Sequence, residues 1–347
     1  MIKDEIAILT AAALLITIIL SIMLLYLVIR KTRENSLRRK VDKYKENLNP
    51  AVLDILLTGQ SIGEIKADSN IEKRALEESL SGYASVLEGS GVRENITALA
   101  EIHLSRDYSR KLKSMHWSRR MNSLFHIDLF SLKALEDDVL FLLKKKISSD
   151  AEKNYSLRIL ASFGHEEAAA RLMESGRTLP QFEYRNILSR LPAVLFERLM
   201  DSFDKCPQPL QNALLDTIGM DKKLEYTGFL EQAIDIHAGE TRIRAFKALV
   251  NIGYVSDVTH YLPYAASSEW QERMLAARLF GVVRDGSLLS VLSGLLRDSS
   301  WWVRFQAGGA IKQYPQGDDL LLSIYQNDSD PYARDMAWEW MNKGEVH

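Results

Sequence analysis

Four segments near the C-terminal end of the chain share one pattern: TRIRAFKALVNIG (241–253), ERMLAARLFGVV (272–283), VRFQAGGAIKQY (303–314) and ARDMAWEWM (333–341). Each has arginine at its second position, alanine at its fifth and a large apolar residue at its ninth. The spacings between the successive arginines are 31, 31 and 30 residues. Because apolar residues at positions 5, 8, 9 and 12 lie on one face of a helix, these segments predict an internal repeat of amphipathic helices.

The same frame extends toward the N-terminus, where its signal is weaker. The corresponding segments begin at Arg120, Lys153, Tyr184 and Gln211. About eight units therefore fill the chain from Arg120 onward. The segments between them, such as SLLSVLSGLLRD (287–298) and GDDLLLSIYQND (317–328), predict a second helix in each unit. Since each helix pair has an apolar face on both sides, we expect an all-α protein in which the pairs stack as an α-solenoid.

An acidic residue recurs ahead of the repeat arginines. Asp298 precedes Arg304 by six residues, and Asp328 precedes Arg334 by the same distance. Aspartate in this position caps the start of a helix. We expect the arginines and aspartates to form a hydrogen-bonded ladder from repeat to repeat, which is a structural role. The ladder comprises Arg242, Arg273, Arg304, Arg334, Asp298 and Asp328.

The segments DSSWWVRFQAGGAI (298–311) and DSDPYARDMAW (328–338) resemble the HEAT-repeat family in its short, lyase-like form. Both carry an aspartate, then an apolar residue followed by arginine, then a small residue three positions on. The repeat is shorter than the roughly 40–47 residues of longer HEAT and armadillo repeats. The resemblance implies a right-handed α-solenoid that binds other proteins, and it implies no single activity.

A run of 24 uncharged residues, IAILTAAALLITIILSIMLLYLVI (6–29), lies near the N-terminus. A helix of this length spans about 36 Å, enough for a hydrocarbon core of about 30 Å. The run is too long for the apolar region of a signal peptide, its N-terminal flank is not net basic, and no small-residue cleavage site follows it. We therefore expect a retained single-pass anchor rather than a cleaved signal.

Basic residues follow the apolar run at once. We predict that this flank contacts the membrane surface through Arg30, Lys31, Arg33, Arg38, Arg39 and Lys40. Basic flanks stay on the cytoplasmic side, so we expect the N-terminus outside and the C-terminal region in the cytoplasm, at the inner membrane. A charged flank that only sets topology is the alternative. Leu37, Val41, Tyr44 and Leu48 form a short apolar seam, which predicts a helix that packs on its own domain.

Composition sets further limits. The 347 residues carry 44 Lys and Arg against 46 Asp and Glu, so the chain is not a globally basic nucleic-acid binder. A single cysteine, Cys206, excludes an internal disulfide framework. We predict four regions, namely a transmembrane anchor at 1–29, a basic juxtamembrane helix at 30–50, a helical N-terminal cap at 51–112 and HEAT-like repeats at 113–347.

Residue patterns that carry chemistry are missing from the sequence. The seven histidines make no pair at zinc-ligand spacing, and the chain has no phosphate-binding glycine loop and no G-x-S-x-G turn. Adjacent carboxylates such as Asp318 and Asp319 point apart on a helix. Cys206 is expected to be a buried, idle thiol. We therefore predict no catalytic residue, no metal site, no cofactor and no small-molecule substrate.

The tryptophans are the best candidates for a contact surface. Trp117, Trp270 and Trp301 each lie three residues before a repeat arginine, where a helix begins. Trp338 and Trp340 are two residues apart and cannot share one helix face, so one of them is expected to be exposed or covered by a partner. We predict that a protein partner contacts Trp270, Trp301, Trp302, Trp338 and Trp340.

The function favoured by these patterns is a non-enzymatic, membrane-tethered scaffold for a membrane-associated protein partner. In architecture the chain resembles single-pass bacterial HEAT-repeat proteins found with membrane glycosyltransferases, which implies an accessory role in such an enzyme or in another envelope assembly. Two alternatives stay open. One is a HEAT-like enzyme, a chromophore lyase or a DNA-alkylation glycosylase, and the other is a transmembrane signalling linker.

Overall fold

The structure, a computed structural model, describes residues 2–60, 65–174 and 179–343, with side chains from residue 14 onward. These described residues form helices and connecting turns, with no β-strand among them. The chain divides into two compact units, residues 1–163 and residues 164–347. The predicted boundary between residues 112 and 113 stays a prediction.

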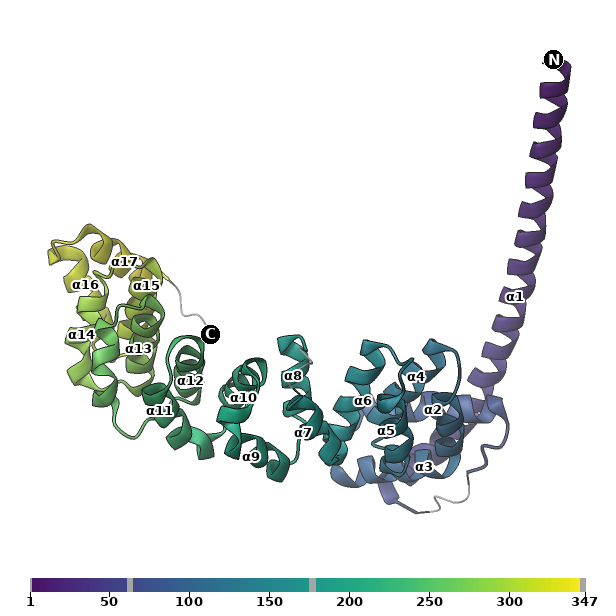
Figure 1. Cartoon of the computed structure of the whole chain (residues 1–347), viewed down its shortest axis with the longest axis horizontal. Helices are drawn as coiled ribbons and strands as arrows, with labels where there is room; N and C mark the ends of the chain where they lie inside the picture. Colours follow the sequence, from purple (N-terminus) through teal and green to yellow (C-terminus); the bar gives the residue numbers. More distant parts are fainter. Residues whose placement is uncertain (1, 61–64, 175–178, 344–347) are drawn as a thin grey trace. The chain divides into compact units, whose positions relative to one another are not determined.

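The first unit contains α1 (Ile2–Thr58), α2 (Asn70–Val86), α3 (Ser90–Leu112), α4 (Trp117–Leu129), α5 (Glu136–Lys144) and α6 (Asp150–Phe163) (Figure 1). The second unit contains α7 (Glu166–Leu172), α8 (Gln181–Leu188), α9 (Ala193–Asp201), α10 (Gln208–Met220), α11 (Thr227–Ile236), α12 (Gly239–Ile252), α13 (Trp270–Val283), α14 (Leu289–Leu295), α15 (Trp301–Lys312), α16 (Gly317–Asn327) and α17 (Pro331–Asn342). Short 3₁₀ helices connect some of them, namely η2 (Lys133–Leu135), η3 (Phe203–Lys205), η4 (Leu224–Tyr226), η5 (Val258–Ala266) and η6 (Gly286–Leu288).

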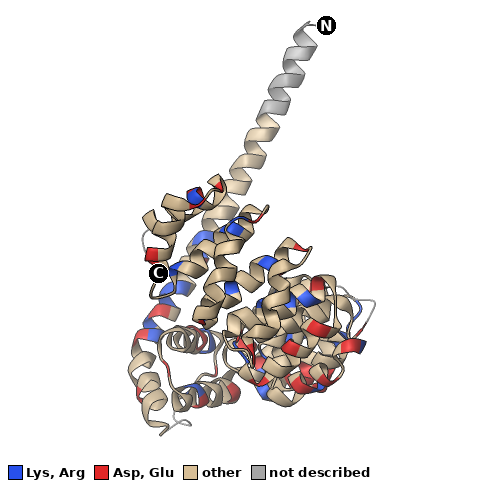
Figure 2. Cartoon of the chain, turned by 90° about the vertical axis from the view of Figure 1, so that its left-hand side faces the viewer, with Lys and Arg blue, Asp and Glu red and all other residues tan. Residues whose placement is uncertain are grey.

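Helix α1 contains the apolar run and is one continuous helix of 57 residues. Among the described residues it alone is long and apolar enough to cross a membrane, and none of its apolar window is buried against the rest of the chain. Figure 2 shows the described part of this run free of charged residues. The helix continues past Pro50, where the basic helix was predicted to end, because the following turns bury Val52, Ile55 and Leu56.

The C-terminal half of α1 packs against α2 and α3. Val41 and Leu48 of the predicted apolar seam are buried there, and the Tyr44 hydroxyl donates to the Lys66 carbonyl at 2.8 Å. Leu37, at the start of the seam, stays exposed. The seam thus packs on its own domain, as its short length predicts.

The repeat frame maps onto a regular series of helices, most of them separated by one other helix. The eight repeat segments identified in the sequence lie in α4, α6, α8, α10, α12, α13, α15 and α17. Within the second unit, α10 packs on α12, α12 on α13, α13 on α15 and α15 on α17 (Figure 1). The fifth-position alanines are fully buried at these contacts: Ala245, Ala276, Ala307 and Ala337.

The second helices of the units are less uniform than the repeat predicts. The segments 287–298 and 317–328 contain α14 and α16, as expected. After α12, however, the corresponding segment is the 3₁₀ helix η5, which contains Pro263. Proline has no N–H and clashes with the preceding turn of an α-helix, which accounts for the departure.

Glycines allow the closest approaches between neighbouring helices of the second unit. A Cβ atom built on Gly281 of α13 would lie 2.7 Å from the Ala310 Cβ and 2.8 Å from the Ala310 Cα of α15. Gly219 of α10 faces Ala248 of α12 in the same way. These contacts involve the backbone of the facing helix, so a side chain at either glycine requires the helices to move apart.

We predict that Gly281→Ala destabilises the protein by about 1–3 kcal/mol, although alanine is the better helix former. The matched control is Gly294→Ala in α14, because a Cβ atom there meets nothing within 4 Å. This control is expected to be neutral or to stabilise by up to about 1 kcal/mol. Thermal unfolding followed by circular dichroism measures both, and equal effects from the two variants would contradict the close packing of α13 on α15.

Candidate functional site

The repeat arginines bind the turns that precede their own helices. Arg273 Nη1 donates to the carbonyls of Ser267 and Ser268, at 2.8 and 3.1 Å. Arg304 Nη1 donates to the carbonyls of Asp298 and Ser299, at 2.7 and 3.2 Å. Arg120, Arg242 and Arg334 make comparable bonds to carbonyls five to eight residues earlier in the chain. Each guanidinium therefore satisfies backbone acceptors that the turn leaves free.

Asp298 connects one repeat to the next. Its carboxylate accepts from Arg273 Nε at 2.6 Å and from Arg273 Nη2 at 2.8 Å, and it also accepts from the Ser300 N–H at 2.8 Å. Both side chains of the ion pair are mostly buried. Burial alone would raise the pKa of Asp298, but the bonds from Arg273 and from the Ser300 N–H hold this pKa below its ordinary value.

Asp328 has a different partner from the one that the ladder predicts. Its carboxylate pairs with Arg297, at 2.7 and 3.1 Å, and accepts from the Asp330 N–H. The Arg304 guanidinium lies instead over the Tyr332 ring, 4.9 Å from its centroid. Of the two aspartates, only Asp298 therefore pairs with a repeat arginine of the preceding helix.

Two glutamates take the aspartate's place in other repeats, and the sequence pattern did not identify them. Glu152 pairs with Arg120 at 2.5 Å, with both side chains buried, and also accepts from the Ser149 N–H. Glu272 pairs with Arg242 at 3.2 Å. They lie 32 and 30 residues after their arginines, so the repeat spacing was the available signal.

An aromatic cluster lies on α15 and α17, and we call Trp301, Trp302, Phe305 and Trp340 the aromatic patch. The Trp301 ring packs edge-on against Trp302 and stacks on Phe305, with centroids 4.9 Å apart in both pairs. The Phe305 ring is 4.9 Å from Trp340. Trp301 and Trp302 are 43% and 55% exposed, so the patch presents aromatic side chains to solvent.

Lys343 contacts two rings of the aromatic patch, and Trp340 packs closely on α15. Lys343 Nζ lies 4.1 Å from the Phe305 centroid and 4.6 Å from that of Trp340, within range of cation–π attraction. Trp340 itself covers Gly308 and Gly309 of α15, where a Cβ atom would clash with its indole. The predicted separation of Trp338 and Trp340 is thus observed, because Trp340 packs inward and Trp338 is 53% exposed. Neither Phe305 nor Lys343 was identified from the sequence, which does not reveal that α15 and α17 meet there.

Three tryptophans begin helices, and two of these, Trp117 and Trp270, lie outside the aromatic patch. Trp117, Trp270 and Trp301 are the first residues of α4, α13 and α15, as the repeat frame predicts. Trp270 is 36% exposed and makes no ring contact among the described residues. The structure therefore gathers Trp301, Trp302 and Trp340 of the predicted contact residues, and places Trp270 and Trp338 outside that group.

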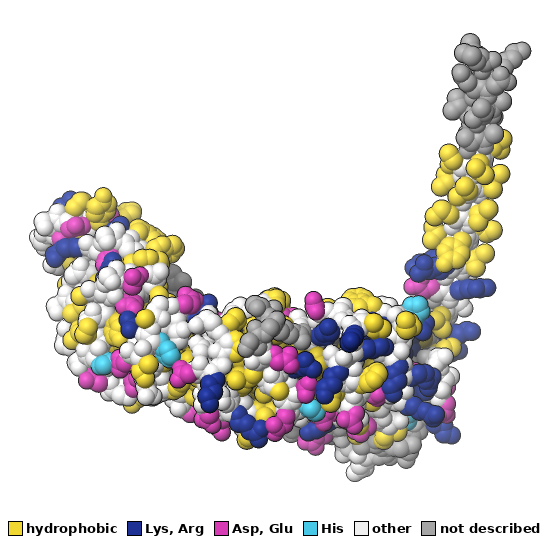
Figure 3. Space-filling view, in the orientation of Figure 1, with side chains coloured by type: hydrophobic (Ala, Val, Ile, Leu, Met, Phe, Trp, Pro, Cys, Tyr) yellow, Lys and Arg dark blue, Asp and Glu magenta, His cyan; other side chains and the backbone are white. Residues whose placement is uncertain are grey.

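The predicted membrane-surface residues lie on α1 directly after the apolar run. Arg30, Lys31, Arg33, Arg38, Arg39 and Lys40 are all exposed. Figure 3 shows hydrophobic side chains along the described shaft of α1, followed by basic ones. Arg38 differs from the others because it pairs with Asp42 at 3.1 Å and with Glu78 of α2 at 2.8 Å.

Groups capable of chemistry are scattered or engaged within the protein. No group of three or more His, Cys, Asp and Glu residues that could hold a metal ion occurs in the part of the chain that is described. Burial raises the pKa of the Cys206 thiol to about 11, which keeps it protonated at neutral pH. Glu77, Tyr108 and His126 contact one another between α2, α3 and α4, and burial lowers the pKa of His126.

No known family profile matches the chain, and a search of curated protein sequences finds no match either.

We predict that Asp298→Asn destabilises the protein at pH 7 by about 1.5–3 kcal/mol, because Arg273 loses its charged acceptor. The pKa of Asp298 is lowered on folding, so its contribution is complete above the unfolded pKa of about 4 and is lost as the pH falls through the folded pKa. The difference in melting temperature between wild type and variant should therefore become smaller in acid. Thermal melts across the pH range measure it.

The control for this prediction is Glu166→Gln, which removes the charge from the exposed pair of Glu166 with Arg198. Solvent screens this pair, so its loss should have little effect at any pH. If the loss of stability in D298N is the same at neutral and acidic pH, or is no larger than the loss in E166Q, the role assigned to Asp298 is refuted.

Proposed function

We propose that the chain is a single-pass protein of the cytoplasmic membrane, with its N-terminus outside and its helical units in the cytoplasm. The support is α1, which is apolar and without buried contacts over Leu14–Ile29 and basic immediately afterwards. Because basic flanks are retained on the cytoplasmic side, the order of charges supports this orientation.

The helices from α4 onward form, in this proposal, a right-handed α-solenoid of HEAT-like helix pairs. Three observations support it: the repeat positions fall on a regular series of helices, the fifth-position alanines are buried, and α8, α10, α12, α13, α15 and α17 each pack on the next of the series. A chain built of nearest-neighbour contacts presents an extended surface, which suits the binding of another protein.

The function is that of a non-enzymatic interaction scaffold, and the aromatic patch is the observation that carries it. Exposed tryptophans offer large apolar area at a small entropy cost, and they are enriched among the residues that dominate binding energy. Here the Trp301 ring stacks on Phe305 of α15, which packs in turn against Trp340 of α17, so the exposed tryptophans adjoin a packed aromatic base. Binding of a partner removes this surface from water.

The partner is a membrane-associated protein, because α1 tethers the chain that bears the patch to the membrane. A membrane glycosyltransferase or another component of an envelope assembly fits this position. The patch lies in a unit with 25 Asp and Glu against 19 Lys and Arg, so this part of the chain is net acidic. An acidic unit is poorly suited to nucleic acid, which agrees with a protein partner.

The test is purification of the tagged full-length protein in mild detergent, with co-purifying proteins identified by mass spectrometry. We expect an integral membrane protein in stoichiometric amount. Trp301→Ala combined with Trp302→Ala should reduce its recovery at least about tenfold, since two exposed anchors are removed. Helicity should be unchanged, because neither side chain is buried.

The matched control combines Phe182→Ala with Tyr254→Ala, which removes two equally exposed aromatic side chains outside the patch. This variant should recover the partner as the wild type does. Recovery of the same partner by W301A/W302A, or the lack of any stoichiometric partner with the wild type, would argue against the proposal.

A further inference from the structure

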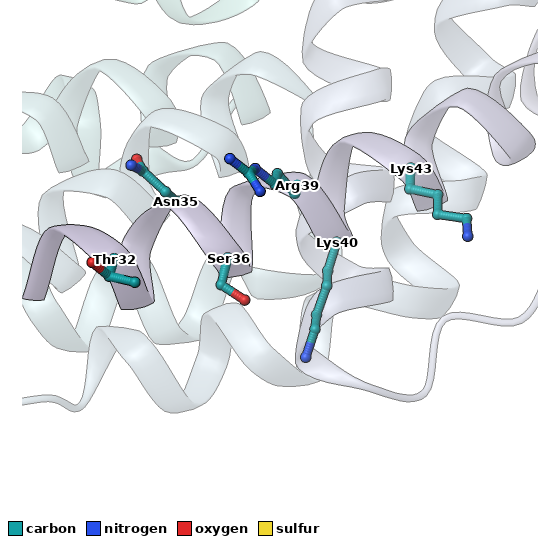
Figure 4. Close-up of a pocket in the computed structure, with 6 residues that line it drawn as sticks. All are labelled: Thr32, Asn35, Ser36, Arg39, Lys40 and Lys43. Atoms are coloured by element: carbon teal, nitrogen blue, oxygen red, sulfur yellow. The ribbon is translucent and has the colours of Figure 1, made fainter. Parts of the chain in front are cut away.

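One face of α1 beyond the apolar run is entirely polar and points away from the protein core. A groove on it is lined by Thr32, Asn35, Ser36, Arg39, Lys40 and Lys43 (Figure 4). Their spacings of 3, 1, 3, 1 and 3 residues place them on a single face of the helix. This face combines three cations with the Asn35 amide and the Ser36 hydroxyl, which are groups that donate hydrogen bonds to phosphate oxygens, whereas the Thr32 hydroxyl donates to the Val28 carbonyl.

The opposite face of α1 is the one that packs. Val41 is fully buried, whereas Arg39 and Lys43 each lie two residues from it, which is about 200° around the helix. The polar face is therefore turned away from the folded unit.

These three cations differ from their neighbour Arg38 in their ion pairs. Arg38 is held by Asp42 and by Glu78 of α2, toward the protein. Among the described residues, no carboxylate lies within 4.0 Å of the charged groups of Arg39, Lys40 or Lys43. The three positive charges thus face solvent with no internal counter-ion, next to the segment that enters the membrane.

We propose that this face of α1 binds the anionic phospholipid headgroups of the cytoplasmic leaflet and thereby sets the tilt of α1. The inference rests on the membrane span of the proposed function and is independent of the aromatic patch. The occupant is identified by charge complementarity and by continuity with the span, since the face begins two residues after Arg30.

The length of α1 explains why tilt is involved. Lys43 lies 13 residues beyond Arg30, about 20 Å along the helix axis, whereas the headgroup region of one leaflet is only about 5–8 Å thick. An upright helix would therefore carry Lys40 and Lys43 out of the headgroups, by more than a Debye length of about 8 Å for Lys43. A leaning helix lowers both residues and turns their side chains toward the headgroups.

The apolar run favours the same lean. Its 24 residues extend about 36 Å, which exceeds a hydrocarbon core of about 30 Å, and a tilt of roughly 30–35° removes this mismatch. Because the polar face is opposite the packing face, α1 can lean onto the leaflet without pressing the folded first unit into the bilayer.

The experiment uses full-length protein in lipid nanodiscs, with a fluorophore on Ser36→Cys in a Cys206→Ser background. Quenching by a nitroxide on the lipid headgroup reports how close the polar face lies to the leaflet. We expect quenching about twofold or more greater when phosphatidylglycerol is added to phosphatidylcholine, and loss of this increase at high salt.

The variant R39Q/K40Q/K43Q should abolish the increase, while Arg30, Lys31 and Arg33 still fix the orientation. The control R106Q/R110Q/R119Q neutralises three exposed basic residues elsewhere in the first unit and should keep the increase. Quenching that is equal in the two lipids, or that is unaffected by R39Q/K40Q/K43Q, overturns the lipid face but leaves the span intact. A protein that does not enter nanodiscs overturns the span itself.

Discussion

The bond from each repeat arginine to the turn before its own helix is the interaction on which the helix order depends. A helix pair of about 31 residues cannot bury both of its apolar faces alone, so each helix must begin where its neighbour can cover it. The guanidinium of Arg273 or Arg304 fixes that starting point by binding two carbonyls of the turn. Asp298 then joins one such turn to the arginine of the preceding repeat, so that local capping and stacking reinforce each other.

Local patterns predicted the parts of the structure that local physics decides. The alanine at the fifth position had to be small for helices to approach, and Ala245 and its counterparts are buried. Trp270 and Trp301 begin helices where the frame placed them. The 3₁₀ helix η5 was missed because the repeat pattern was given more weight than Pro263. The pairing of Arg297 with Asp328 and the meeting of Phe305 with Trp340 and Lys343 depend on how helices far apart in sequence pack, which no single-helix pattern reveals.

The two candidate surfaces differ in chemistry as well as in position along the chain. The first unit carries 25 Lys and Arg against 21 Asp and Glu, and its polar α1 face is basic. The second unit is net acidic and bears the aromatic patch. In the proposed function, the basic face meets the anionic leaflet, and the aromatic patch binds a protein partner.

The central claim is that α1 is a retained span that holds the helical units on the cytoplasmic side. Its most direct test is protease treatment of intact spheroplasts that produce the full-length protein with a C-terminal tag. A cytoplasmic interaction unit predicts an uncleaved chain of 39.5 kDa plus the mass of the tag. This chain should resist carbonate extraction, and its tag should be degraded only after the membrane is broken. A shortened soluble product, or a tag that is degraded in intact spheroplasts, would contradict it.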